Sequence, residues 1–278
     1  MNRTLRLLGL GFGVAIVVGL VARSDPAALF GVFPRIGWGF AAILAARAAT
    51  IIVDCAAWSR LVPRSERPAF APMVTLRWIG ESINTTLPVA QIGGDVVRAR
   101  LLQRRLAVPA RGVASVAVDF CLSLFAQILF TLLGFVLLAR LGHAADWWPV
   151  ASGAALSAGL VPVFATLSWE LLVRRRLLAA AQRWAARLGQ RRLAATLRAL
   201  GAALGRIALG RAALALSLAL HLASFIGHAG ELWLTLRLMG VSTGFAEAVL
   251  LESLSLAARS AAFPLVDSRY FRFEPRTQ

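Results

Sequence analysis

The chain of 278 residues is 59% hydrophobic and only 15% charged, and its mean hydropathy is +0.72. A soluble domain of this size carries roughly 25% charged residues, so the composition excludes a soluble globular protein. It favours an all-α, polytopic membrane protein. The formal charge is +17, and all 30 basic residues are arginine. Because these arginines cluster between apolar runs, they fit loops that face anionic lipid better than a nucleic-acid surface.

Six apolar runs approach or exceed the roughly 20 residues that cross a hydrocarbon core. They lie at about 5–22, 38–58, 113–139, 148–173, 212–238 and 246–266. The first run resembles a signal peptide, but the following "VARSDP" offers no small-residue cleavage site, so we expect a retained membrane helix. Cys55 and Cys121 lie inside apolar runs and have no metal-ligand spacing, and we expect both to be small core residues.

The segments between the runs differ sharply in charge. Arginines crowd residues 59–77, 98–111 and 174–211, whereas residues 23–36 and 140–147 hold few. The positive-inside rule therefore predicts a cytoplasmic N-terminus and places the three arginine-rich segments on the cytoplasmic side. We expect residues 174–211 to form a pair of amphipathic helices there, and we assign no site to them.

This topology depends on the stretch "WIGESINTTLPVAQIGGD", residues 78–95, which must not cross the bilayer once. Eighteen residues are too few to cross it twice at about 1.5 Å rise per residue. Pro88 removes a backbone donor, and Gly93 and Gly94 permit a tight reversal. We therefore predict a re-entrant, broken-helix segment that dips into the membrane and returns. The alternative is an ordinary interfacial loop between two helices.

Polar residues in the run 212–238 are spaced by three or four positions, which places them on one helical face. They are Ser217, His221, Ser224, His228, Glu231 and Thr235. We expect this face to point into the helix bundle, either as plain hydrogen-bonded packing or as part of a site. His228 and Glu231 are spaced to share a metal ion, but no further ligands are evident, so we predict no metal.

The run 113–139 holds Asp119, a carboxylate that needs a partner inside a membrane. The run 38–58 supplies Arg47 and Asp54, two turns apart on one helical face. Because a charge inside a membrane needs an opposite charge beside it, we hypothesise an ion pair of Arg47 with Asp119 or with Asp54.

Residues 95–108, "DVVRARLLQRRLAV", are typical of a short basic amphipathic helix. Asp95 suits its first turn, where backbone N–H groups are free. A glycine turn that opens a helix beside Arg98 and Arg100 could cradle a lipid phosphate. Simple anchoring to the membrane by positive charge is the alternative.

The stretch "RWIGESINTTLPVAQIGGDVVRARLL" resembles the lysylphosphatidylglycerol synthase transmembrane (flippase-like) family, and especially its hopanoid-biosynthesis-associated branch. The resemblance covers residues 1 to about 263 and includes the later "LLESLSLAARSAAF". It implies a multi-pass protein of the bacterial inner membrane that handles amphipathic lipids. The residues that we expect to line a lipid site or pathway are Glu81, Asn84, Pro88, Gln91, Gly93, Gly94, Asp95, Arg98, Asp119, His228, Glu231, Glu252 and Arg259.

The chain departs from the family pattern after Phe263, where further membrane helices would follow and "PLVDSRYFRFEPRTQ" stands instead. We therefore expect a transmembrane domain over residues 1–266 and an atypical tail over 267–278. A frameshift or premature end is the simplest interpretation of that tail.

Three classes of function remain open. The first is flippase-like transport of an amphipathic lipid linked to hopanoid metabolism, and the second is a non-transporting lipid-binding or scaffold subunit beside lipid-biosynthesis enzymes. The third, an intramembrane enzyme, would use Glu81, Asp95 and the His228–Glu231 pair as acid–base groups, but we find no catalytic constellation. The expected partners are membrane lipids, either anionic phospholipid or hopanoid. We expect no cofactor and no nucleic acid.

Overall fold

The computed structural model describes residues 31, 36–86, 93–140 and 176–267, and this part of the chain holds eight helices and no strand. The all-α prediction is therefore confirmed. The helices are α3 (Gly39–Ser59), α4 (Phe70–Thr86), α5 (Gly93–Gln103), α6 (Pro109–Arg140), α8 (Arg176–Arg187), α9 (Arg191–Leu209), α10 (Arg211–Leu238) and α11 (Phe245–Asp267).

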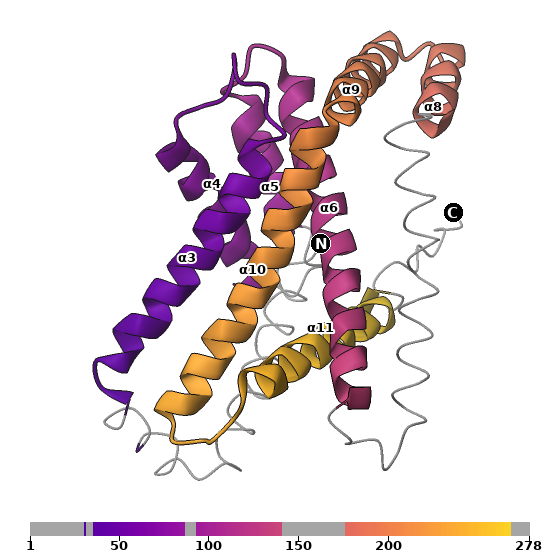
Figure 1. Cartoon of the computed structure of the whole chain (residues 1–278). Coiled ribbons are helices and arrows are strands. Elements are labelled where there is room, and N and C mark those ends of the chain that lie inside the picture. The colour runs from indigo at the N-terminus through magenta and orange to yellow at the C-terminus, as the bar shows by residue number, and fades with distance from the viewer. Residues whose placement is uncertain (1–30, 32–35, 87–92, 141–175, 268–278) are drawn as a thin grey trace, which may run out of the picture.

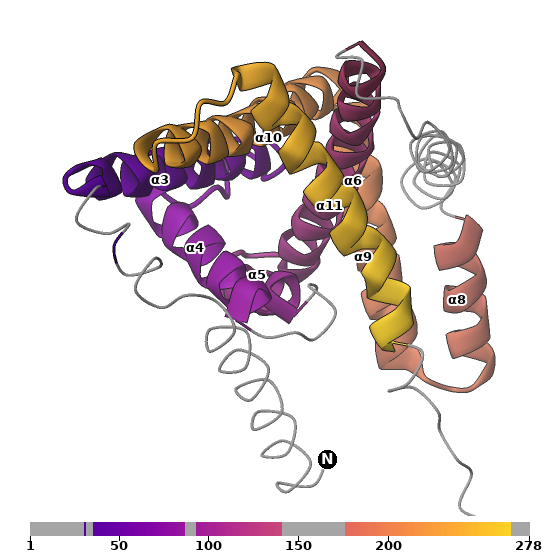
Figure 2. The same cartoon turned by 90° about the horizontal axis from the view of Figure 1, so that it is seen from below.

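Among the described residues, three helices, α3, α6 and α10, are long and apolar enough to cross a membrane. They match the predicted spans 38–58, 113–139 and 212–238 to within a few residues. Helix α11 matches the predicted range 246–266 but is not among these three, and it lies across α6 and α10 (Figures 1 and 2). The predicted spans 5–22 and 148–173 lie outside the described residues.

Helices α4 and α5 form an antiparallel hairpin beside the long helices (Figure 1). Gly93 lies opposite Ile83, and Arg98 lies opposite Gly80. At 1.5 Å rise per residue, α4 is about 25 Å long and α5 about 16 Å long. Both are shorter than the roughly 30 Å of a hydrocarbon core. Residues 87–92, the middle of the predicted re-entrant segment 78–95, lie outside the described residues, so the re-entrant course stays a prediction.

One detail of the prediction was wrong. Gly93 and Gly94 begin α5 instead of forming the reversal. Gly94 lies directly against Gly80 of α4, and a Cβ at Gly94 would overlap the Gly80 carbonyl oxygen. The pair therefore permits close approach of two helices, the role that small residues take inside membranes.

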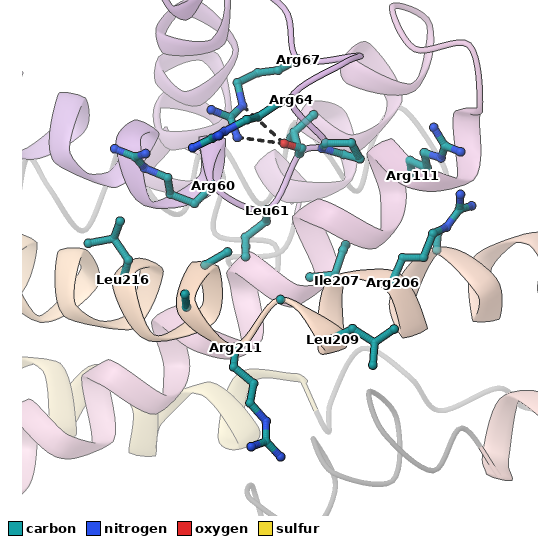
Figure 3. A pocket seen from close by; sticks show the side chains of 16 residues that line it. Arg60, Leu61, Arg64, Arg67, Arg111, Arg206, Ile207, Leu209, Arg211 and Leu216 are labelled. Atoms are coloured by element: carbon teal, nitrogen blue, oxygen red, sulfur yellow. Dashed lines mark hydrogen bonds between the residues drawn. The ribbon is translucent and has the colours of Figure 1, made fainter.

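The arginine-rich segments converge at one end of the bundle (Figures 1 and 3). The connection from α3 to α4, the start of α6 and the junction of α9 with α10 line one common pocket there. Helices α8 and α9 pack against each other, as predicted for residues 174–211, and Gly189 permits the turn between them with a φ of 69°.

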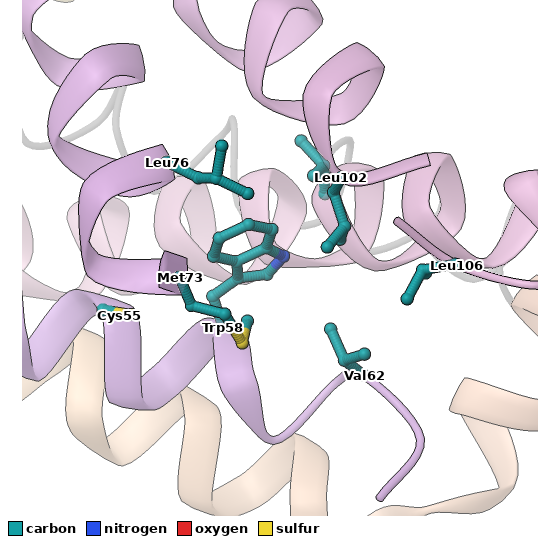
Figure 4. Packing of buried hydrophobic residues seen from close by; sticks show 8 residues of the cluster. Cys55, Trp58, Val62, Met73, Leu76, Leu102 and Leu106 are labelled. Carbon is teal, nitrogen blue, oxygen red and sulfur yellow. The ribbon is translucent and has the colours of Figure 1, made fainter. Parts of the chain in front are cut away.

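Trp58, near the end of α3, is the centre of the core that holds the hairpin (Figure 4). Its side chain is fully buried, with Leu76 of α4 and Leu102 of α5 in the same cluster. The indole Nε1–H donates a hydrogen bond to Ser115 Oγ of α6 at 3.3 Å. The two arms of the hairpin thus share one aromatic anchor with two membrane helices.

We predict that Gly94→Ala destabilises the protein and that Gly93→Ala serves as its matched control. The added methyl at Gly94 must displace the backbone of α4, an overpacking that typically costs about 1–3 kcal/mol. At Gly93 the nearest atom, Ile83 Cγ2, would be 3.8 Å from the new Cβ. Thermal unfolding in detergent, followed by tryptophan fluorescence, should show a clearly lower Tm for Gly94→Ala alone. Equal Tm values for the two variants would contradict this close packing.

Candidate functional site

Four ionisable side chains from four helices form a closed ring inside the bundle. Arg77 of α4 contacts Asp119 Oδ2 of α6 at 3.0 Å and Asp54 Oδ2 of α3 at 3.1 Å. His221 of α10 completes the ring, with Nε2 3.1 Å from Asp119 Oδ1 and Nδ1 3.3 Å from Asp54 Oδ1. Each cationic or imidazole group thus bridges both carboxylates.

The ring is almost closed to solvent. The side chains of Asp119 and His221 are 0% and 1% exposed. Asp119 lies about 15 Å along α6 from its first residue, at 1.5 Å per residue. Both ring nitrogens of His221 face carboxylate oxygens, and only an imidazolium can donate both bonds. The ring therefore brings opposite charges together at a depth where an isolated charge would be costly.

Arg98 of α5 connects the hairpin to this ring. Its Nη2 lies 2.8 Å from Asp119 Oδ2 and 2.7 Å from Asp95 Oδ1, and its guanidinium lies 4.6 Å from the ring centroid of Trp58. Asn84 of α4 ties down the start of α5, since its Oδ1 accepts a hydrogen bond from the Gly94 N–H at 2.7 Å. The Asn84 amide also donates to Asp95 Oδ2 at 3.4 Å.

A second, more open cluster lies around Arg47 of α3. Arg47 Nη2 contacts Glu81 Oε1 of α4 at 3.0 Å, and its Nη1 lies 3.8 Å from Glu231 Oε2 of α10. These three side chains are between 23% and 33% exposed. The cluster extends the polar interior along α3, α4 and α10, away from the Trp58 core.

The ion-paired groups of the ring, of Arg98 and of the Arg47 cluster carry an excess of acid. Five carboxylates (Asp54, Glu81, Asp95, Asp119 and Glu231) face three guanidiniums (Arg47, Arg77 and Arg98) and one histidine. Even with an imidazolium at His221, the set is negative. Such a concentration of charge in membrane helices is typical of substrate or ion pathways.

Several buried donors near the ring have no partner among the described residues. They are Nε and Nη1 of Arg98 and the hydroxyls of Ser217 and Ser224. Ser217 and Ser224 flank His221 by one helical turn each, on the face of α10 that the sequence predicted to point inward. A buried donor without a partner carries a desolvation cost, which an oxygen acceptor placed beside it would remove.

The structure brings together six of the predicted polar site residues: Glu81, Asn84, Asp95, Arg98, Asp119 and Glu231. His228 is instead half-buried, edge-on to Phe225 with 6.1 Å between ring centroids, and Glu252 lies on α11. Pro88, Gln91 and the side chain of Arg259 lie outside the described residues.

The hypothesis that Arg47 pairs with Asp54 or Asp119 was wrong. Arg47 lies two turns from Asp54, about 10 Å along the helix, and Glu81 of the hairpin reaches it first. Arg77, which the sequence analysis assigned to a cytoplasmic loop, takes both aspartates. The available signal was its spacing from Glu81 and from Asn84, four and seven residues, which puts all three on one helical face.

The predicted phosphate cradle at the start of α5 is also occupied by the protein itself. Asn84 takes the Gly94 N–H, and Arg98 is buried between two aspartates. Of the two arginines predicted to bind the phosphate, Arg98 is buried and Arg100 is exposed.

We predict that Arg77→Gln strongly destabilises the protein, because it leaves Asp54 and Asp119 short of one cation. Removing one partner from a buried ion pair typically costs about 3–5 kcal/mol. Arg100→Gln, on the exposed face of α5, is the control and should change stability by less than about 0.5 kcal/mol. Thermal unfolding in detergent compares the two variants.

The double variant Asp54→Asn/Arg77→Gln separates pairing from simple loss of a side chain. Because both members of one pair are removed together, its destabilisation should be smaller than the sum of the two single effects. Additive effects would show that the Arg77–Asp54 contact contributes nothing.

Comparison with known proteins places the chain in a family. No curated protein and no solved structure matches the chain significantly. The family model described as the lysylphosphatidylglycerol synthase TM region matches residues 6–266, nearly the whole chain and every ion-paired residue above. The chain therefore belongs to the lysylphosphatidylglycerol synthase transmembrane-region family.

Proposed function

We propose that this membrane protein moves an amphipathic lipid between leaflets, in the manner of a flippase. The observation that carries the proposal is the cluster of buried charges that joins a short hairpin to the membrane helices α3, α6 and α10. Broken helices that carry polar groups at membrane depth build the substrate sites of many transporters.

The ion pairs suggest how a headgroup could enter. The hairpin contributes Arg77 and Arg98, whereas the membrane helices contribute Asp54, Asp119 and His221. An incoming headgroup that offers oxygens to the unpartnered donors of Arg98 and an ammonium or hydroxyls to the carboxylates would exchange with these contacts. The hairpin would then shift against the membrane helices without leaving any charge unpaired.

We further propose that the lipid belongs to hopanoid metabolism and that the protein lies in a bacterial inner membrane. The resemblance to the hopanoid-associated branch supports this assignment. The carboxylate excess is consistent with it, because a hydroxylated or amine-bearing tail can donate hydrogen bonds to several carboxylates.

A non-transporting lipid-binding or scaffold role is the second candidate. It would use the same charges only to hold the hairpin in place. An enzymatic role has less support, because the acid–base candidates Glu81 and Asp95 are each held by an arginine.

We expect Asp95→Asn to abolish lipid movement in proteoliposomes. The variant removes the charge that holds Arg98 at the hairpin, and the exchange of ion pairs needs that charge. The assay follows dithionite quenching of NBD-labelled phosphatidylglycerol, with unlabelled hopanoid bearing a hydroxylated tail as the competitor. Asp95→Asn should fall to the rate of protein-free vesicles, whereas Glu247→Gln, an exposed carboxylate on α11, should keep the wild-type rate.

Two results would redirect the proposal. Wild-type protein that moves no labelled lipid, but co-purifies with lipid-biosynthesis enzymes, would favour the scaffold role. Transport without competition by hopanoid would retain the flippase and remove the hopanoid link. The Tm of each variant is measured in parallel, so that misfolding is recognised.

The orientation of the chain is tested with a pair of single-cysteine variants. We propose that the arginine-rich end faces the cytoplasm. Arg64→Cys at that end and Val241→Cys beyond the opposite end of α10 are both placed at exposed positions, in a background without Cys55 and Cys121. A membrane-impermeant maleimide should label only the second in intact spheroplasts, and the reverse pattern would invert the topology.

A further inference from the structure

A large pocket lies at the arginine-rich end of the bundle, apart from the buried ion pairs. Its volume is about 970 Å³. Three segments distant in sequence contribute to it: the connection from α3 to α4, the start of α6 and the junction of α9 with α10 (Figure 3). Six arginines line it: Arg60, Arg64, Arg67, Arg111, Arg206 and Arg211.

The positive charge of this pocket is largely uncompensated. Arg111 pairs with Glu66, and Arg67 donates to the backbone carbonyl of Val62 from Nε and Nη2, at 3.3 and 3.0 Å. Within the described residues, Arg60, Arg64 and Arg206 form no ion pair. Partial burial lowers the pKa of Arg67, and the neighbouring charges of Arg60 and Arg64 lower it further. An anion in the pocket would relieve this repulsion.

The remaining lining is apolar. Leu61, Ile207, Leu209 and Leu216 lie below the guanidiniums of Arg60, Arg64, Arg67 and Arg111 in Figure 3. Leu209 is 84% exposed and Leu216 is 43% exposed, although each is beside charged groups. Apolar surface next to a cluster of arginines is the chemistry of an amphipathic anion, with a phosphate above and a hydrocarbon portion below.

We propose that this pocket is a binding site for the phosphate group of an anionic ligand. Guanidinium groups bind phosphate through paired, charge-assisted hydrogen bonds. Figure 3 shows Arg60, Arg64 and Arg67 gathered on one side of the pocket and Arg111 with Arg206 on the other. A phosphate between these two groups receives donors from both sides. The site shares no residue with the ion pairs of the proposed transport pathway, so it stands whether or not the protein moves lipid.

Two sources could supply this phosphate: the headgroup of an anionic lipid or a free phosphorylated metabolite. The apolar lining favours the lipid. The pocket lies beside Arg211, the first residue of α10, and α10 is a candidate membrane span. Lipid phosphates meet a membrane protein at the ends of its membrane spans, so this position also favours the lipid.

The test uses the full-length protein in neutral detergent and in nanodiscs. Calorimetry with inorganic pyrophosphate measures the free source, and native mass spectrometry after nanodisc exchange counts retained dioleoyl phosphatidic acid against phosphatidylcholine. The variant is Arg64→Gln/Arg206→Gln, in which both residues are exposed and without an ion pair in the described part of the chain. Losing two charge-assisted contacts should weaken binding by at least roughly tenfold.

Arg198→Gln is the matched control. It removes an exposed arginine from α9, the helix that carries Arg206, but Arg198 does not line the pocket. It should weaken binding less than threefold, and the Tm of all variants should match that of the wild type.

The outcomes separate the two sources. Retention of phosphatidic acid that the double variant loses, without pyrophosphate binding, identifies a lipid headgroup site. Pyrophosphate binding that the double variant loses identifies a site for a free phosphate ligand. Absence of both, or equal losses for the double variant and Arg198→Gln, would overturn the proposal.

Discussion

The contact between the Arg77 guanidinium and the two aspartates Asp54 and Asp119 is the interaction on which the described structure depends. It is the point where the hairpin meets α3 and α6. Inside a membrane, the burial of apolar surface does not drive helices to associate, because lipid tails are as apolar as the side chains. A hairpin too short to span the bilayer therefore needs polar contacts and close packing, which Arg77 and the Gly80–Gly94 approach supply.

Stability alone does not account for this arrangement. Well-packed apolar residues often replace a buried ion pair without loss of stability, yet this bundle contains a whole series of such pairs. It also leaves buried donors of Arg98, Ser217 and Ser224 without partners in the described part of the chain. A purely structural core would satisfy or omit these atoms. The excess of charge and donors therefore supports our proposal that the hairpin contacts exchange with a ligand.

The sequence predicted the parts of this structure that periodicity controls. Hydropathy located α3, α6 and α10, and the three-and-four spacing identified the inward face of α10 that contains His221. The sequence also showed that Asp119 needs a partner. The sequence could not identify that partner, because whether Arg77 or Arg47 reaches Asp119 depends on how far α4 enters the bundle. Likewise, the sequence could not predict the close approach of Gly94 to Gly80, because that contact depends on how α4 and α5 pack. From the sequence alone, the double glycine indicates a helix-breaking turn instead.

The two charged regions are arranged in series along α6. Arg111, at the pocket, precedes Asp119, at the ring, by eight residues, or about 12 Å of helix. The six arginines of the pocket give it a positive charge, whereas the ion-paired groups of the interior carry an excess of carboxylates. If both proposals hold, a phosphate is favoured at the pocket and repelled farther in, whereas hydroxyl or ammonium groups are favoured inside. This arrangement of charges would then orient an amphipathic lipid before the hairpin moves.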